Sequence, residues 1–300
     1  MTAMPDALIP PEVRARLPEL RLGARRAVGD RGIGLHRSRS RGAGLEFAQY
    51  RAYEPGDEPR QIDWKLYARS DRFFVREAER ESPLAVWLLV DASASMAQAD
   101  RARPGYSRLD AARGIAACIA ELALLQGDRF GLVALAQEAP QLLPAAQGAR
   151  ARDRLWLALR AIVAQGRFPQ PERLGPAWER IAPGDLVVVL SDGFDDAALD
   201  LAERLAAARR EVWFIRIVTV EERDFPFSGG HLFRDPETGE RLPGDGKALR
   251  EGFLARFAEA QRACDARLAA AGIAHTRHVL DEALDLPLRR LLAGRSMDAA

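Results

Sequence analysis

The stretch LAVWLLVD at residues 84–91 decides the fold of this 300-residue chain. It is an unbroken apolar run that ends in an acid, and it is too short for a typical helix. Such a run is typical of a parallel strand that is buried on both faces of a sheet. We therefore expect a central strand here, with Asp91 at its carboxyl end.

Apolar runs alternate with stretches of helical spacing along the rest of the chain. Ser107 is expected to begin a helix as its N-cap, with Asp110 three positions on, and Gly127 is expected to end it. Further strands are predicted at residues 130–135, 186–190, 212–218 and 273–280, and further helices at residues 151–164, 197–209, 247–271 and 286–292. This alternation predicts an α/β fold with a doubly wound, mostly parallel sheet that helices cover on both faces.

The first part of the chain lacks this alternation, so residues 1–82 are expected to form an N-terminal extension to a main domain at residues 83–300. Arginine dominates residues 14–41 and glycines punctuate them, which favours a solvated basic arm or a docking surface for an acidic partner. The later part of the extension is expected to hold two extended segments bridged by a helical turn, at residues 46–53, 73–81 and 62–69. Within the main domain, a Pro-, Gly- and charge-rich stretch at about residues 221–246 predicts a hairpin-like insertion.

The charges of the chain nearly cancel, with 44 Lys and Arg against 43 Asp and Glu. No overall charge therefore draws the protein to nucleic acid or to an anionic membrane. Its two cysteines, Cys118 and Cys264, lie on the apolar stripes of predicted helices, which favours buried thiols in a reducing compartment. The N-terminus lacks the features of a secretory signal, and no apolar stretch approaches the roughly 20 residues of a membrane span. These features predict a cytoplasmic protein without an integral membrane segment.

Acids and hydroxyls follow two of the predicted strands. Asp91, Ser93 and Ser95 alternate along one loop, and Asp192 follows the apolar run at residues 187–190. Ser and Asp are also ordinary turn and N-cap residues at such places. In a doubly wound sheet, however, ligands bind beyond the carboxyl ends of the strands, and carboxylate and hydroxyl oxygens suit Mg²⁺. The pairing of the two loops therefore favours a divalent-cation site formed by these four residues.

This arrangement resembles the von Willebrand factor A fold, whose metal-ion-dependent adhesion site has an Asp-x-Ser-x-Ser loop, a Thr and a distal Asp. Asp91, Ser93 and Ser95 match the loop, and Asp192 matches the distal Asp. The Thr has no counterpart, because residues 165–176 hold neither Thr nor Ser. The resemblance therefore implies a site for Mg²⁺ or another divalent cation, and three alternatives stay open: weak binding, binding with an additional water, or loss of the ion while the fold persists.

A second resemblance covers nearly the whole chain. Residues 51–57, 60–64 and 68–69 are similar to the signature of the bacterial family catalogued as domain of unknown function 58. The signature residues are Tyr53, Gly56, Asp57, Arg60, Asp63, Trp64 and Arg69. Two roles are open for them: a salt-bridge network that docks the N-terminal segment, or direct recognition of a partner. Family members are commonly paired with MoxR-type AAA+ ATPases in chaperone-like maturation or metal insertion, so the resemblance implies an adaptor whose partners are such an ATPase and a client protein.

Two other functions compete with an adaptor. A Mg²⁺-dependent hydrolase could use Asp91 and Asp192, but the sequence shows no base or nucleophile set near Asp91. Nucleic-acid binding could use the arginine-rich arm, which lacks the interleaved aromatics of a stacking platform. His275 and His278 lie in a predicted strand whose alternation points them to opposite faces, so they do not predict a zinc site. We accordingly expect a protein that is not an enzyme.

Overall fold

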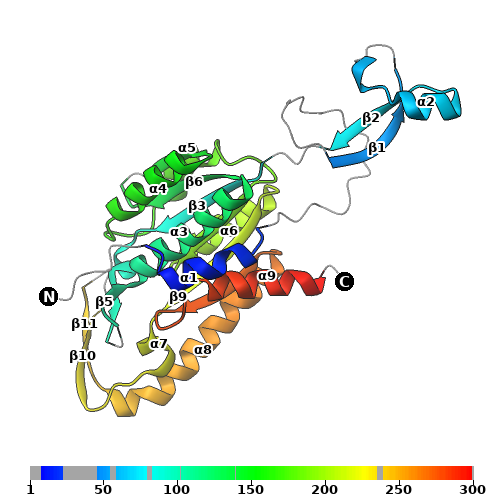
Figure 1. The fold of residues 1–300 in the computed structure, drawn as a ribbon. Helices are drawn as coiled ribbons and strands as arrows, with labels where there is room; N and C mark the ends of the chain where they lie inside the picture. Colours follow the sequence, from blue (N-terminus) through cyan, green and yellow to red (C-terminus); the bar gives the residue numbers. More distant parts are fainter. Residues whose placement is uncertain are drawn as a thin grey trace. The chain divides into compact units, whose positions relative to one another are not determined.

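The computed structural model describes residues 8–22, 46–54, 59–79, 83–101, 103–138, 140–234 and 239–298 (Figure 1). The chain forms two compact units. Residues 27–83 form the smaller unit, and residues 1–26 together with residues 84–300 form the larger one. The larger unit contains every predicted cation ligand.

A six-stranded sheet forms the centre of the larger unit. In spatial order its strands are β12 (Ala274–Val279), β9 (Glu211–Val218), β8 (Leu186–Ser191), β3 (Ala85–Asp91), β6 (Arg129–Leu135) and β7 (Gln141–Ala146). Neighbouring strands are parallel except β6 and β7, which pair antiparallel. The order reverses between β3 and β8, because the chain adds β6 and β7 on one side of β3 before it returns to β8 on the other. The predicted doubly wound, mostly parallel sheet is therefore confirmed.

Helices cover both faces of this sheet (Figure 1). One face carries α1 (Pro11–Arg16), α3 (Arg108–Gln126), α4 (Ala149–Ala161) and α9 (Leu286–Asp298), and the other carries α5 (Gly175–Trp178), α6 (Asp196–Ala207) and α8 (Gly246–Ala270). Side chains of β3 alternate between the two cores, with Leu88 in the first and Leu89 in the second. Because both faces are covered, all residues of β3 are buried, which explains the unbroken apolar run.

Local signals set the two ends of α3. Ser107 and Asp110 form a capping box, and Gly127 ends the helix with a φ of 75° that a glycine adopts readily. Shorter elements connect the main ones: η1 (Leu17–Glu19), η3 (Ala94–Ala97), β4 (Ala99–Asp100), β5 (Arg103–Ser107), η4 (Pro171–Leu174), α7 (Val220–Asp224), β10 (Gly230–Arg234) and β11 (Arg241–Asp245). β10 and β11 pair antiparallel within the segment predicted as an insertion.

The N-terminal residues differ from the prediction of one extension at residues 1–82. The described residues 8–22 pack into a core of the larger unit, where Leu17 is fully buried. Arg16 donates from Nε and Nη2 to Asp285 at 2.9 and 2.6 Å. Burial of the apolar side chains offsets the cost of ordering the segment, so the start of the predicted basic arm belongs to the α/β unit.

The sequence pattern does not predict β7, which lies at one edge of the sheet. Its sequence QLLPAA contains Pro144, which has no backbone N–H to donate to a neighbouring strand. An edge strand tolerates such a residue because one of its sides has no partner strand. The proline therefore makes a true strand look like a loop.

The smaller unit contains β1 (Glu46–Ala52), η2 (Pro59–Gln61), α2 (Trp64–Ser70) and β2 (Phe74–Glu79). β1 and β2 pair antiparallel, and the two extended segments and the helical turn agree with the prediction. Residues 23–45, which include most of the predicted basic arm, lie outside the described residues. Within the described parts of both units, no helix is long and apolar enough to cross a membrane.

Candidate functional site

The predicted cation ligands meet where the strand order reverses. Asp91 is the last residue of β3, and Asp192 follows the last residue of the neighbouring parallel strand β8. Ser93 and Ser95 follow Asp91 at the turn that opens η3. All four side chains are buried, with exposures of 5% or less. The structure therefore gathers the four residues at the edge of the sheet where doubly wound folds bind ligands.

Hydrogen bonds from Ser93 and Ser191 hold Asp91. Ser93 N donates to its Oδ1 at 2.8 Å, and Ser191 Oγ donates to its Oδ2 at 2.6 Å. Burial, and secondly the charge of Asp192, raise the pKa of Asp91 to about 6, while the hydrogen bonds from Ser191 and Ser93 oppose the rise. The ionised form of Asp91 is therefore costly in this fold, and a bound cation would reduce that cost.

The two serine hydroxyls lie side by side, with Ser93 Oγ 3.1 Å from Ser95 Oγ. The loop that carries them is tied to the segment in which the von Willebrand factor A pattern has its Thr. Ala94 N donates to Gly166 O at 2.9 Å. This segment thus runs alongside the Asp91 loop, yet its side chains offer no hydroxyl.

Arg108, which no sequence motif singles out, bonds directly to the predicted cation ligands. It is the first residue of α3 and is 1% exposed. Its Nη1 donates to Asp192 Oδ2 at 3.1 Å and to Ser95 O at 2.9 Å, and its Nη2 donates to Glu222 Oε1. A cation that belongs to the protein itself therefore neutralises Asp192.

Helix α7 fixes the second acid that binds Arg108. Thr219 caps α7 and forms a capping box with Glu222, whose Oε2 accepts from Thr219 N at 2.9 Å. One feature of the sequence points to Arg108: it follows the predicted N-cap Ser107. A positive charge at the first position of a helix opposes the helix dipole and is expected to have an acid as its partner. The acids themselves are 84 and 114 residues away along the chain, so local pattern does not reveal them.

The oxygen donors suit a divalent cation. Asp91, Ser93 and Ser95 offer a carboxylate and two hydroxyls, which are hard donors of the kind that Mg²⁺ prefers. Both oxygens of Asp192 already accept hydrogen bonds, one from Phe194 N at 3.1 Å and one from Arg108. Among the described residues, no group of three or more His, Cys, Asp or Glu side chains is arranged to hold a metal ion. A cation here would therefore depend on the serine hydroxyls.

The signature residues belong to the smaller unit and not to the unit with the cation ligands. Asp63 caps α2, where its Oδ1 accepts from Lys65 N at 3.0 Å. Gly56 and Asp57 lie outside the described residues. Of the remaining signature side chains, Tyr53 is half-buried and Arg60, Trp64 and Arg69 are exposed.

Aromatic rings gather around α2 in the smaller unit. Tyr67 and Phe73 stack with ring centroids 4.4 Å apart, and the edges of Trp64 and Tyr53 approach Phe73 at 6.4 and 6.2 Å. Trp64 is nevertheless 59% exposed. The signature therefore contributes a helix cap and part of an exposed aromatic cluster.

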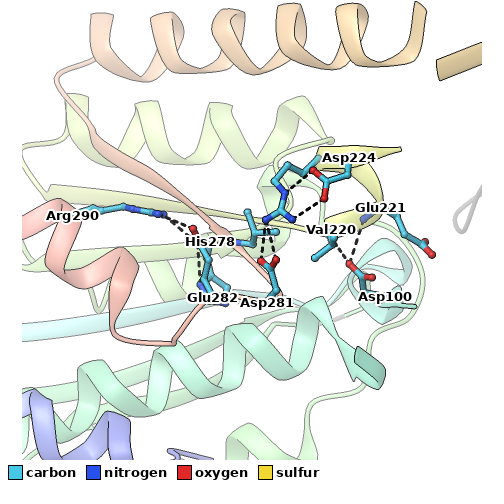
Figure 2. Close-up of polar contacts among 10 residues, drawn as sticks. Asp100, Val220, Glu221, Asp224, His278, Asp281, Glu282 and Arg290 are labelled. Carbon is cyan, nitrogen blue, oxygen red and sulfur yellow. Dashed lines mark hydrogen bonds and ion pairs between the residues drawn. The ribbon is translucent and has the colours of Figure 1, made fainter. Parts of the chain in front are cut away.

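A second polar group lies beside α7 (Figure 2). The carboxylate of Asp100 accepts from the backbone N–H groups of Val220 and Glu221 at the start of α7. Arg223, at the other end of α7, donates to Asp281 at 3.0 Å. These contacts tie α7 to β4 and to the segment that follows β12.

His278 lies in the same region and is fully buried. Its Nδ1 is 3.8 Å from Glu282 Oε2, and within the described structure neither ring nitrogen has a hydrogen-bond partner. Burial lowers the pKa of His278 to about 4. His275 lies over the opposite core, because it pairs with Phe214 and His278 pairs with Ile217. The two histidines therefore face away from each other, as the strand alternation predicts.

The chain is similar to known proteins over most of its length. The profile of the family described as "Protein of unknown function DUF58" matches residues 49–263. Uncharacterized protein Rv1480 of Mycobacterium tuberculosis (strain ATCC 25618 / H37Rv) is 30% identical over 264 residues, which cover 86% of this chain and 81% of that protein. Uncharacterized protein Mb1516 of Mycobacterium bovis (strain ATCC BAA-935 / AF2122/97) matches to the same extent.

Two solved structures are similar at lower identity. The conserved hypothetical protein BatB from Bacteroides thetaiotaomicron has 16% identity and a TM-score of 0.44, over 72% of this chain and 100% of that one. The SpRpn10 VWA domain has 15% identity and a TM-score of 0.41, over 70% of this chain and 95% of that one. The family profile and the relatives at 30% identity decide the assignment: the chain belongs to the DUF58 family.

Proposed function

We propose that this protein is a metal-ion-dependent protein-interaction adaptor. The DUF58 membership and the von Willebrand factor A-like sheet support a protein-interaction role. The observation that carries the proposal is the meeting of Asp91, Ser93, Ser95 and Asp192 where the strand order reverses.

In this proposal Asp91, Ser93, Ser95 and Asp192 hold Mg²⁺ or another divalent cation. The ion would bind a carboxylate of a partner protein through its positive charge. The chain's own contribution beside it is Phe194, which is 57% exposed two residues after Asp192. An exposed ring next to a charged centre offers a partner both apolar contact and charge pairing.

The partner in this proposal is a MoxR-type AAA+ ATPase, and the complex acts on a client protein in maturation or metal insertion. This part follows from the family resemblance. It assumes the cytoplasm, where ATP is available to such a partner, and the two free buried cysteines, Cys118 and Cys264, suit a reducing compartment.

Calorimetric titration with Mg²⁺ and Mn²⁺ tests the ion, and capture of a purified MoxR-type ATPase from the same organism tests the partner. Asp91→Ala and EDTA are each expected to abolish capture. Asp196→Ala is the matched control, because this acid follows Asp192 closely but its side chain is 89% exposed. Capture that persists unchanged in Asp91→Ala and in EDTA would contradict the metal dependence of the adaptor. Turnover of phosphoesters that disappears in Asp91→Ala would instead favour a Mg²⁺-dependent hydrolase.

A further inference from the structure

Arg108 carries a full positive charge in a position that water does not reach. Its side chain is 1% exposed and stacks over Phe194, with the guanidinium carbon 5.2 Å from the ring centroid. A buried charge is costly unless acids and hydrogen-bond acceptors compensate it. The acids that compensate Arg108 are therefore part of what keeps it in place.

Two acids on different elements share this guanidinium. Asp192, after β8, accepts a hydrogen bond from Nη1, and Glu222, in α7, accepts one from Nη2. Ser95 of the predicted cation loop adds its backbone oxygen to Nη1 at 2.9 Å. Arg108 thus bonds at the same time to two of the predicted cation ligands and to an acid outside that set.

A cation at Asp192 would lie close to this guanidinium. Two positive charges a few ångströms apart repel strongly where water is excluded, because the effective dielectric constant is low. We propose that Arg108 is a built-in competitor of the divalent cation: it neutralises Asp192 when no ion is bound, and an ion binds only by displacing it from Asp192. The inference rests on the proposed cation site and names what regulates it.

Glu222 makes such a displacement feasible. Its carboxylate is held by the capping box of α7 and remains bonded to Nη2 when Nη1 leaves Asp192. Arg108 therefore keeps one acid partner, Glu222, in either state and need not move into solvent. Such a competition would by itself weaken ion binding, whether or not the site has a Thr ligand.

Mg²⁺ affinity of purified full-length variants, measured by calorimetry, tests the competition. Arg108→Gln is expected to bind Mg²⁺ about ten-fold tighter than the wild type, since the competing charge is gone. Arg108→Lys keeps the charge but loses the guanidinium fork that bonds both acids, so its Mg²⁺ affinity is expected to lie between those of the wild type and Arg108→Gln. Arg216→Gln is the matched control, because Arg216 is also buried but bonds to Asp265 outside the predicted ligand set, and it is expected to leave Mg²⁺ affinity unchanged.

A second comparison avoids the unpaired Glu222 that Arg108→Gln leaves behind. Glu222→Gln and the double variant Arg108→Gln/Glu222→Gln differ only at Arg108, and neither retains the Glu222 charge. The double variant is expected to bind Mg²⁺ about ten-fold tighter than Glu222→Gln and to show a larger rise of Tm with added Mg²⁺. Equal affinities in this pair would overturn the competition.

The outcomes separate this inference from the proposed function. Mg²⁺ binding by the wild type that Asp91→Ala abolishes, together with no gain in Arg108→Gln, would overturn the competition and leave the cation site standing. No Mg²⁺ binding by the wild type or by either Arg108→Gln variant would overturn both. Binding that appears only when Arg108 is removed would support the competition.

Discussion

Replacing His278 by Leu is expected to remove much of the pH dependence of stability between pH 6.5 and pH 4. His278 is fully buried, and burial lowers its pKa from 6.5 to about 4. The positive charges of Arg290 and Arg103 act in the same direction, and Glu282 and Asp281 oppose them. The imidazole is therefore neutral in the folded protein at pH values at which it is protonated in the unfolded chain.

The sign and size of this contribution to the pH dependence of stability follow from the difference between the pKa values of His278 in the unfolded and folded states. The unfolded chain takes up a proton near pH 6.5 and the folded protein only near pH 4, so this contribution to stability is intact above pH 6.5 and is lost as the pH falls towards 4. A difference of 6.5 minus 4 units corresponds to about 3 kcal/mol. Leu has a similar volume and no unpaired nitrogens, so the variant is expected to be as stable as the wild type at pH 7.5, or more stable by about 1 kcal/mol.

Urea unfolding followed by circular dichroism from pH 7.5 to pH 4.5 measures this difference. Carboxylates that titrate in this range do so in both proteins, so subtracting the two curves isolates His278. His275→Leu is the control, because His275 is partly exposed and lies over the other core. Parallel curves for the wild type and His278→Leu would refute the assignment of His278 as a buried neutral ring.

Three further predictions concern charge and docking in the larger unit. Asp91→Asn in EDTA is expected to stabilise the protein by up to about 3 kcal/mol at pH 7.5, because the pKa of Asp91 in the folded protein, about 6, exceeds the usual 3.8. The gain in stability appears as the pH rises from 4 to 6. A difference in stability that does not vary with pH would count against the raised pKa of Asp91. Asp285→Ala is expected to cost about 2 kcal/mol at pH 7, since it removes a buried carboxylate that Arg16 and Arg289 share. Burial raises the pKa of Asp285, but the hydrogen bonds from the two arginines lower it below the usual 3.8, so this cost fades as the pH falls below 3.8. An unchanged urea midpoint at pH 7 would exclude these ion pairs as stabilisers. Leu17→Ala is expected to cost about 3 kcal/mol of stability and to speed amide exchange in α1, because Leu17 is fully buried in the core. Exchange in α1 like that of the wild type would show that this helix does not depend on the burial of Leu17.

The sheet was predictable because its strands are marked locally. β3 and β8 are buried on both faces, and that burial demands an apolar residue at nearly every position. The ends of α3 are marked by Ser107 and Gly127, whose roles depend only on the adjacent backbone. β7 was not predicted because a proline interrupts its apolar pattern. α1 was not predicted because it is short and its burial depends on helices that are distant in the sequence.

Sequence alone determined that Asp91, Ser93, Ser95 and Asp192 would stand at strand ends, because strand periodicity and the order of elements leave few other places for them. The tertiary structure alone decided what compensates their charge. Arg108 reaches Asp192 and Glu222 across 84 and 114 residues of chain, and such pairing depends on which loops the sheet brings together. Burial of a charge is a property of the folded surroundings, so no local pattern specifies it.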